Sequence, residues 1–237
     1  MKASARPSVL ASWFDKLTMK RSSHHDANYC YDAKHSVPRS HAMTRLIFLA
    51  AALLAAMSGA AQAHTGHELG GALVGFLHPL GGLDHLLAMV GVGIWAAHVA
   101  TRDRRAVWLV PAAFVVLMVV GGALAVAGLR LPMVETGILG SVLLLGVILL
   151  AAPTLPVWVP MIAVGLFALF HGHAHGSEMP SAAAPLAYAA GFVVATAALH
   201  ALGVGIGIAA RRVGGLVGTR ALGGLVTLGG VALLAAG

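Results

Sequence analysis

Six apolar runs, separated by short polar connections, constrain the fold of this chain more than any other feature. Most of them approach or exceed the roughly 20 residues that a helix needs to cross the hydrocarbon core of a bilayer. Inside that core every backbone donor and acceptor must be paired within the chain, which favours helices. The sequence therefore predicts an all-α, polytopic membrane bundle with six transmembrane helices, at residues 71–97, 107–129, 133–151, 157–171, 185–209 and 214–236.

The distribution of charge agrees with a membrane bundle and argues against a nucleic-acid-binding surface. Of the 237 residues, 59% are hydrophobic and 10% are charged, a composition typical of membrane proteins. The formal net charge of +7 is misleading, because all the lysines precede His64. From His64 onward, seven arginines stand against five acidic residues. Cys30 also precedes His64, so neither disulfides nor thiolate ligands are expected in the bundle.

The region before His64 is expected to lie outside the bundle. Residues 43–63 have a basic start, an apolar core too short to span a bilayer, and a final Ala-Gln-Ala, which together are typical of a cleavable signal peptide. Cleavage there would leave residues 64–237 as the mature six-helix transmembrane domain. Residues 1–42 show no periodic pattern. Either translation begins at Met43, which we favour, or this segment is a disordered extension.

Arginines predict the orientation of the bundle. Short loops rich in arginine stay in the cytoplasm, and an exported N-terminus gives the same orientation independently. We therefore expect a multi-pass protein of the bacterial cytoplasmic (inner) membrane whose mature N-terminus is periplasmic. The arginines that carry this argument follow the first and the fifth predicted spans: Arg102, Arg104 and Arg105, and Arg211, Arg212 and Arg220.

The first apolar run contains the stretch His78-Pro79-Leu80-Gly81-Gly82-Leu83-Asp84-His85. Two imidazoles and a carboxylate at membrane depth are costly, and they persist only if they face something polar. On an unbroken helix Asp84 would point about 120° away from His78. A break at Pro79–Gly82 would let the three side chains converge, and such ligands suit a divalent first-row metal ion. The alternative is a kinked helix whose histidines hydrogen-bond to neighbouring helices.

A second polar motif, Phe170-His171-Gly172-His173-Ala174-His175-Gly176-Ser177-Glu178, ends the fourth predicted span. His171 and His175 are four residues apart and Glu178 is three further on, so a continuing helix would carry all three on one face. His173 would point elsewhere. Two imidazoles and a carboxylate at this spacing can bind one metal ion. The alternative is a solvated loop that binds metal only incidentally.

Other candidate residues are weaker on local grounds. Glu135 begins the third span, where a carboxylate also favours the helix dipole. In the predicted topology it gathers with both motifs on the outer side, which predicts an ion-capture vestibule open to the periplasm. His64 and His67 either concentrate metal at the mature N-terminus or belong to a short polar tail. His200, near the middle of the fifth span, either continues an ion path toward the cytoplasm or, as we favour, packs against its neighbours. Phe114 is a core or lipid-facing residue.

These motifs resemble the signatures of a known family. HPLGGLDH fits the HPxxGxDH pattern of the HupE/UreJ family of nickel (and cobalt) permeases, and FHGHAHGSE resembles the second signature of that family. The leader followed by HTGHE is also similar, and the resemblance covers essentially the whole mature chain. Related nickel-cobalt transporters carry an HX4DH signature instead, whereas five residues separate His78 from Asp84 here.

The resemblance implies a secondary permease rather than an enzyme. Its cargo would be Ni²⁺, or Co²⁺, brought inward for metalloenzymes such as hydrogenase or urease, with no permanently bound cofactor. By motif position, the resemblance implies functional roles for His78, Asp84, His85, His175 and Glu178, and it places Glu135 and Phe114 where the family also has functional residues.

Other classes of function stay open. A metal sensor or accessory protein would bind ions without carrying them, and a haem-binding membrane subunit would pair histidines at two depths. An intramembrane metallohydrolase would need a general base beside an open metal position. The histidines cluster with carboxylates instead, and neither an HExxH nor a Walker motif occurs. The expected partners are a divalent transition-metal ion and the bilayer; metal selectivity, energy coupling and a homo-oligomer remain open.

Overall fold

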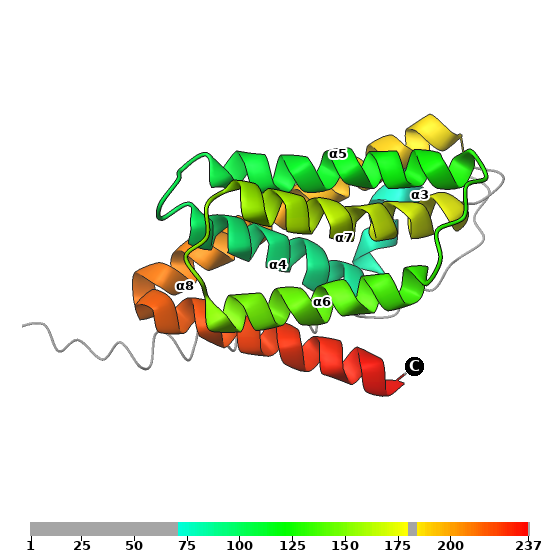
Figure 1. Ribbon diagram of the computed structural model, residues 1–237. Coiled ribbons are helices and arrows are strands. Elements are labelled where there is room, and N and C mark those ends of the chain that lie inside the picture. The colour runs from blue at the N-terminus through cyan, green and yellow to red at the C-terminus, as the bar shows by residue number, and fades with distance from the viewer. Residues whose placement is uncertain (1–70, 180–183, 237) are drawn as a thin grey trace, which may run out of the picture. The chain divides into compact units, whose positions relative to one another are not determined.

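The computed structural model describes residues 71–179 and 184–236, and this part of the chain is helical and contains no strand (Figure 1). The predicted signal peptide, the extension before it, and His64 and His67 lie outside the described residues. In chain order the elements are α3 (Gly71–Leu77), the short 3₁₀ turn η1 (His78–Leu80), α4 (Leu83–Val99), α5 (Ala106–Val126), α6 (Val134–Ala151), α7 (Trp158–Ser177) and α8 (Pro185–Ala236).

The first apolar run is broken as the sequence predicts. The segment Gly71–Leu80 meets α4 at an angle of 81°. Gly82 has extended backbone angles, φ −111° and ψ 128°, which separate the last turn of one segment from the first turn of the next. Proline and paired glycines therefore produce a sharp bend in a run that composition alone would make one straight helix.

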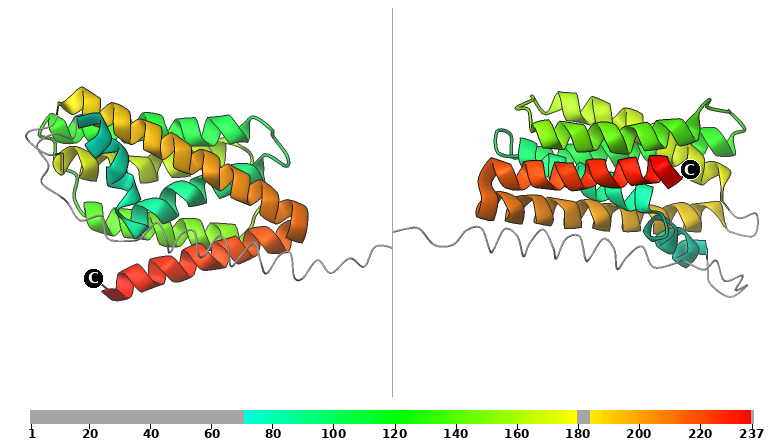
Figure 2. Two further views of the ribbon diagram at one scale, coloured as in Figure 1. Left: turned by 180° about the vertical axis from the view of Figure 1, so that it is seen from behind. Right: turned by 90° about the horizontal axis from the view of Figure 1, so that it is seen from below.

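The last three predicted spans differ from the helices in the structure in where one helix ends and in how two of them are joined. The end predicted at His171 is wrong, because α7 continues through the second motif to Ser177; none of the His, Gly and Ala residues there breaks a helix. The fifth and sixth predicted spans are the two arms of α8, which fold back on each other at Gly215 (Figure 2). Gly215 has φ 59°, in the left-handed region that glycine adopts without a steric penalty.

Several helices are suited to a membrane by length and composition. α5, α6 and α8 are each long and apolar enough to cross a bilayer, and the bent pair α3–α4 provides a further candidate. α7 is less apolar because three histidines fall in its last two turns. Large apolar side chains project from the outer helices, among them Trp108, Leu186 and Leu228. An outward apolar surface of this kind is what lipid contact requires.

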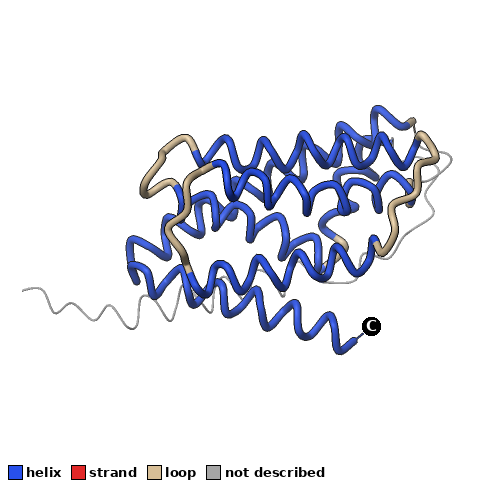
Figure 3. Tube along the Cα trace, in the orientation of Figure 1, coloured by secondary structure: helices blue, strands red, loops and turns tan. Residues whose placement is uncertain are grey.

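The centre of the bundle is α4. Every residue from Leu86 to Val99 is buried, and α4 packs against α5, α6, α7 and α8. Figure 1 shows α4 running between the other helices, and Figure 3 shows the connecting loops gathered at the two ends of the bundle. α4 therefore connects those ends through a wholly enclosed segment.

Glycines bring the helices close together. A Cβ atom added at Gly203 of α8 would overlap the carbonyl oxygen of Val90 in α4, and one added at Gly93 would overlap the carbonyl oxygen of His200. α5 and α7 approach in the same way, because a Cβ at Gly172 would overlap the Met118 carbonyl. Close backbone packing through small residues is how helices associate in membranes, where apolar burial supplies little driving force.

We expect Gly203→Ala to destabilise the bundle by about 1–3 kcal/mol, because the added methyl group has to displace the backbone of α4. Thermal unfolding of the detergent-purified protein measures this effect. Gly205→Ala is the matched control, since a Cβ at that position meets no atom within 4 Å. Equal melting temperatures for the two variants would contradict the close α4–α8 contact.

Candidate metal centre

Three histidines from three separate elements meet at one end of the bundle. His78 of η1, His85 of α4 and His175 of α7 each offer one ligand atom, and these atoms lie within 4.8 Å of one another. The ring centroid of His175 lies 4.4 Å from that of His85 and 4.9 Å from that of His78. We call these three residues the His cluster. Imidazoles at such separations can converge on a single transition-metal ion.

The bend between η1 and α4 creates this convergence. It turns His78 back over the first turn of α4, where His85 lies 6.1 Å away between ring centroids. Gly82 is part of the geometry, because a Cβ there would lie 2.5 Å from Asp84 Oδ1 and 3.2 Å from His85 Nδ1. A side chain at this position would therefore displace the Asp84 carboxylate from its place beside His85.

Two carboxylates flank the His cluster. Asp84 Oδ1 lies 2.7 Å from His85 Nδ1; the contact is close but not aligned as a hydrogen bond. The negative charge of Asp84 favours a proton on Nδ1 of His85, which leaves the lone pair on Nε2 of His85. Glu178 Oε2 lies 3.5 Å from His78 Nε2 and 3.9 Å from His175 Nδ1. Two carboxylates match the charge of a divalent cation.

The side chains of the site become less exposed to solvent from its mouth inward. The side chain of Glu178 is 51% exposed and that of His78 is 30% exposed, whereas His175 and His171 are buried. A hydrated ion approaching from this end would therefore meet the carboxylate of Glu178 first and the buried imidazoles afterwards.

His171 forms the floor of the site and is held in one tautomer. Its ring centroid lies 5.7 Å from that of His85, and its Nε2 lies 3.1 Å from Ser141 Oγ. Ser141 donates its only proton to the carbonyl oxygen of Ile138, at 2.6 Å, so it can only accept from His171. The proton of His171 is thus on Nε2, and Nδ1 keeps a lone pair with no hydrogen-bond partner.

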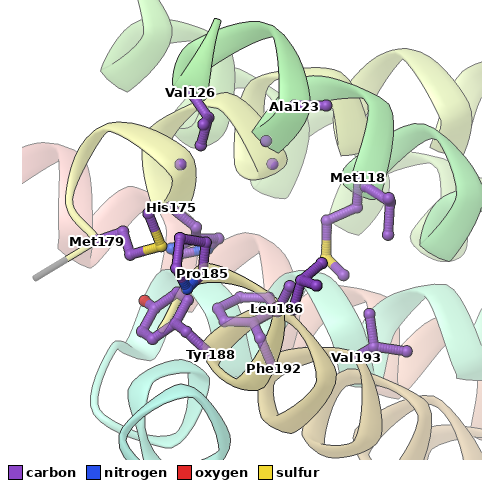
Figure 4. Close-up of a pocket in the computed structure, with 15 residues that line it drawn as sticks. Met118, Ala123, Val126, His175, Met179, Pro185, Leu186, Tyr188, Phe192 and Val193 are labelled. Atoms are coloured by element: carbon purple, nitrogen blue, oxygen red, sulfur yellow. The ribbon is translucent and has the colours of Figure 1, made fainter. Parts of the chain in front are cut away.

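An aromatic wall from α8 closes one side of the site. The ring of Phe192 lies 4.2 Å from that of His175, and Tyr188 lies 5.9 Å from His78. A cavity of about 260 Å³ adjoins this wall, with His175 and Tyr188 at one end and Met118 at the other (Figure 4). Its lining is almost entirely apolar, so the cavity borders the His cluster without extending it.

Six predicted site residues come together and the others lie apart. The rings of His78, His85 and His175 pack against one another, with His171 beneath His85. Asp84 contacts His85, and Glu178 contacts His78 and His175.

Four candidates within the described residues do not join this group. Glu135 is exposed in the first turn of α6 and forms no ion pair within the described part of the chain. The ring of His173 points away, as predicted, and its Nε2 lies 2.8 Å from the Leu129 carbonyl oxygen and 3.2 Å from the Leu131 amide. Phe114 and His200 are buried deeper in the bundle.

Sequence reasoning missed Ser141, Tyr188 and Phe192. Tyr188, Phe192, Thr196 and His200 recur at intervals of four on α8 and are all buried. This spacing was a usable signal, because it places an aromatic and polar stripe on one face of a helix. Ser141 carries no comparable signal, since its contact with His171 depends on how α6 and α7 pack.

The opposite end of the bundle gathers the arginines. Arg104, Arg211 and Arg212 line a cavity of about 430 Å³, so the loop after α4 and the region near the α8 turn lie together. His98 is fully paired there: Arg211 Nη1 donates to its Nδ1 at 3.1 Å, and its Nε2 then donates to the carbonyl oxygen of Pro153 at 3.1 Å. The His cluster and these three arginines therefore occupy opposite ends, whereas Arg130, in the loop after α5, lies at the end of the His cluster.

Comparisons with known proteins agree with the motifs. The family profile described as HupE / UreJ protein matches residues 51–233. The chain belongs to the HupE/UreJ family. It is 48% identical over 181 residues to Protein HupE of Rhizobium leguminosarum bv. viciae, an alignment that covers 76% of this chain and 92% of that protein. No solved structure matches the chain. HupE/UreJ proteins are metal permeases and accessory proteins, which confirms that the chain is not an enzyme.

We expect Gly82→Ala to weaken Ni²⁺ binding by this HupE/UreJ protein about 10- to 100-fold, the range for disturbing a carboxylate partner of a metal-binding histidine. The methyl group would displace the carboxylate of Asp84 from His85. Titration of the purified protein with Ni²⁺ measures the affinity. Gly140→Ala on α6, where a Cβ meets no atom within 4 Å, should bind as tightly as the wild type; equal affinity of the two variants would refute the role of Gly82.

Ser141→Ala should also lower the Ni²⁺ affinity, by about 10-fold, because His171 loses the acceptor that fixes its tautomer. Ser141→Thr keeps a hydroxyl and should restore most of the affinity in the same titration. Thr227→Val removes a hydroxyl that bonds only the Gly223 carbonyl and should have no effect. Unchanged binding by Ser141→Ala would contradict a role of the Ser141 hydroxyl in positioning His171.

Proposed function

We propose that this HupE/UreJ protein is a secondary permease that carries Ni²⁺, with Co²⁺ as a second cargo, across the bacterial cytoplasmic membrane. The ion would enter from the periplasm through the His cluster and its two carboxylates. It would leave at the arginine-rich end and supply metalloenzymes such as hydrogenase or urease. The family is linked to nickel and cobalt uptake for those enzymes, which supports the proposal.

The observation that carries the proposal is the convergence of the His cluster. His78 and His175 belong to motifs separated by two whole helices, yet their ligand atoms and that of His85 fall within 4.8 Å. Buried imidazoles in a membrane-suited bundle are costly unless they pair or line an ion path. A borderline divalent ion of the first transition row fits a site dominated by imidazoles better than Ca²⁺ or Mg²⁺ does.

The proposed topology has six spans. The bent pair α3–α4 would be one span, α5, α6 and α7 one each, and the arms of α8 the last two. The six-span topology is supported by the length of α8, 52 residues with a reversal at Gly215. Because arginine-rich short loops stay in the cytoplasm, the end lined by Arg104, Arg211 and Arg212 would be cytoplasmic and the His cluster periplasmic.

Selectivity for nickel would depend on the geometry of the site and on which metal ions are available to it. Affinity for nitrogen and oxygen ligands rises toward copper along the first-row series, so these ligand types alone do not select nickel. The fixed spacing of the His cluster and the carboxylates is the feature by which the site would discriminate among ions.

We expect His85→Ala and Asp84→Asn each to reduce nickel uptake at least 10-fold in proteoliposomes with matched protein content, because each removes a ligand or its carboxylate partner. Accumulation of radioactive nickel measures uptake. His173→Gln is the matched control, since His173 lies on α7 outside the cluster and contacts the loop after α5. Undiminished uptake by His85→Ala would reject the proposed site.

The same vesicles separate a permease from a sensor or accessory protein. Binding without accumulation by the wild-type protein would favour a sensor. Adding Co²⁺ or Zn²⁺ as a competitor shows which ions share the path.

A further inference from the structure

We call the His cluster together with Asp84, His171 and Glu178 the outer site. His200 is a buried imidazole that does not belong to it. It is 2% exposed, and both its ring nitrogens lack a hydrogen-bond partner among the described residues. Leaving a buried polar group unpaired costs free energy, and such groups in native proteins call for an explanation. Inside a membrane bundle, ionisable residues that face the interior mark ion pathways.

The position of His200 connects it to the outer site. Tyr188, Phe192, Thr196 and His200 follow one face of α8 at intervals of four. The first two contact His78 and His175. His200 lies eight residues beyond Phe192 on the same face, which is about 12 Å deeper along the helix. The stripe therefore leads from the His cluster toward the middle of the bundle.

Phe114 occupies the space between the floor of the site and His200. Its side chain is fully buried on α5. The ring centroid of Phe114 lies 5.9 Å from that of His171 and 5.0 Å from that of His200, edge-on to the latter. An ion held by the outer site would have to pass this ring to reach the deeper imidazole.

We propose that His200 is an inner transfer ligand for the transported cation and that Phe114 separates it from the outer site in the conformation seen here. This inference rests on the proposed permease function. Movement of the Phe114 ring would let the ion pass from His171 to His200. The neighbouring Thr196 on this stripe donates its hydroxyl proton to the Met118 sulfur of α5, so His200 offers the one strong ligand. A single imidazole holds an ion weakly enough to release it, which transport requires.

The test separates binding from transport. His200→Leu fills a similar volume without a ligand atom, and His200→Met fills it with a thioether. We expect both variants to bind Ni²⁺ in detergent with an affinity within about twofold of wild type, since the outer site is intact. In proteoliposomes, His200→Leu should lose at least 10-fold in initial nickel uptake and His200→Met should retain a measurable part of it.

A second variant controls for packing damage. Thr219→Val also replaces a buried polar group without a hydrogen-bond partner on α8, and it lies away from the stripe. We expect it to bind and carry nickel as the wild type does. Loss of uptake in Thr219→Val equal to that in His200→Leu would overturn the proposal, as would equal loss in His200→Leu and His200→Met.

The outcomes distinguish this inference from the proposed function. If the wild-type protein neither binds nor carries nickel, the proposed permease function is rejected. If His200→Leu takes up nickel as fast as the wild type, only the role of His200 as an inner ligand is rejected. Binding weakened in His200→Leu as strongly as uptake would place His200 in the outer site and overturn its separate role.

Discussion

The cost of placing imidazoles and carboxylates inside an apolar helical bundle governs this structure. Such groups are tolerated only where they face one another, and the 81° bend between η1 and α4 is what allows them to do so. A straight helix would spread His78 and Asp84 around its axis. The bend instead directs His78 and His85 toward α7, where His175 completes the His cluster. Thus a local break in one span determines the geometry of the whole site.

Much of this arrangement was predictable from local chemistry. Proline and paired glycines act within a few residues, so the break at Pro79–Gly82 could be read directly from the sequence. Helix periodicity likewise predicted that His171 and His175 share a face while His173 points away. The predicted end of the fourth span was wrong because hydropathy falls at the histidines, whereas the helix continues to Ser177. Hydropathy reports the surroundings of a helix rather than its end.

Other features depended on tertiary packing and could not be predicted. The contact of Ser141 with His171 depends on the approach of α6 to α7. The aromatic wall of Tyr188 and Phe192 depends on where α8 lies. Glu135 shows the opposite problem: a carboxylate at a helix start has the same local signal whether it stabilises the dipole or belongs to a site, and in the structure it stands apart from the His cluster.

The two ends of the bundle are built differently. At one end, unpaired imidazole nitrogens and an exposed carboxylate leave ligand positions available. At the other, Arg211, His98 and the Pro153 carbonyl form a satisfied chain of hydrogen bonds across α8, α4 and the loop after α6. α4 joins these two ends, and it is buried from Leu86 to Val99.

The wide separation of the two motifs along the chain has a consequence for biogenesis. His78 and His85 emerge early in synthesis, whereas His175 and Glu178 follow only after α5 and α6 have been made. A nascent chain that ends before α7 therefore holds only part of the His cluster. The complete set of side chains is assembled only once α7 has packed against η1 and α4.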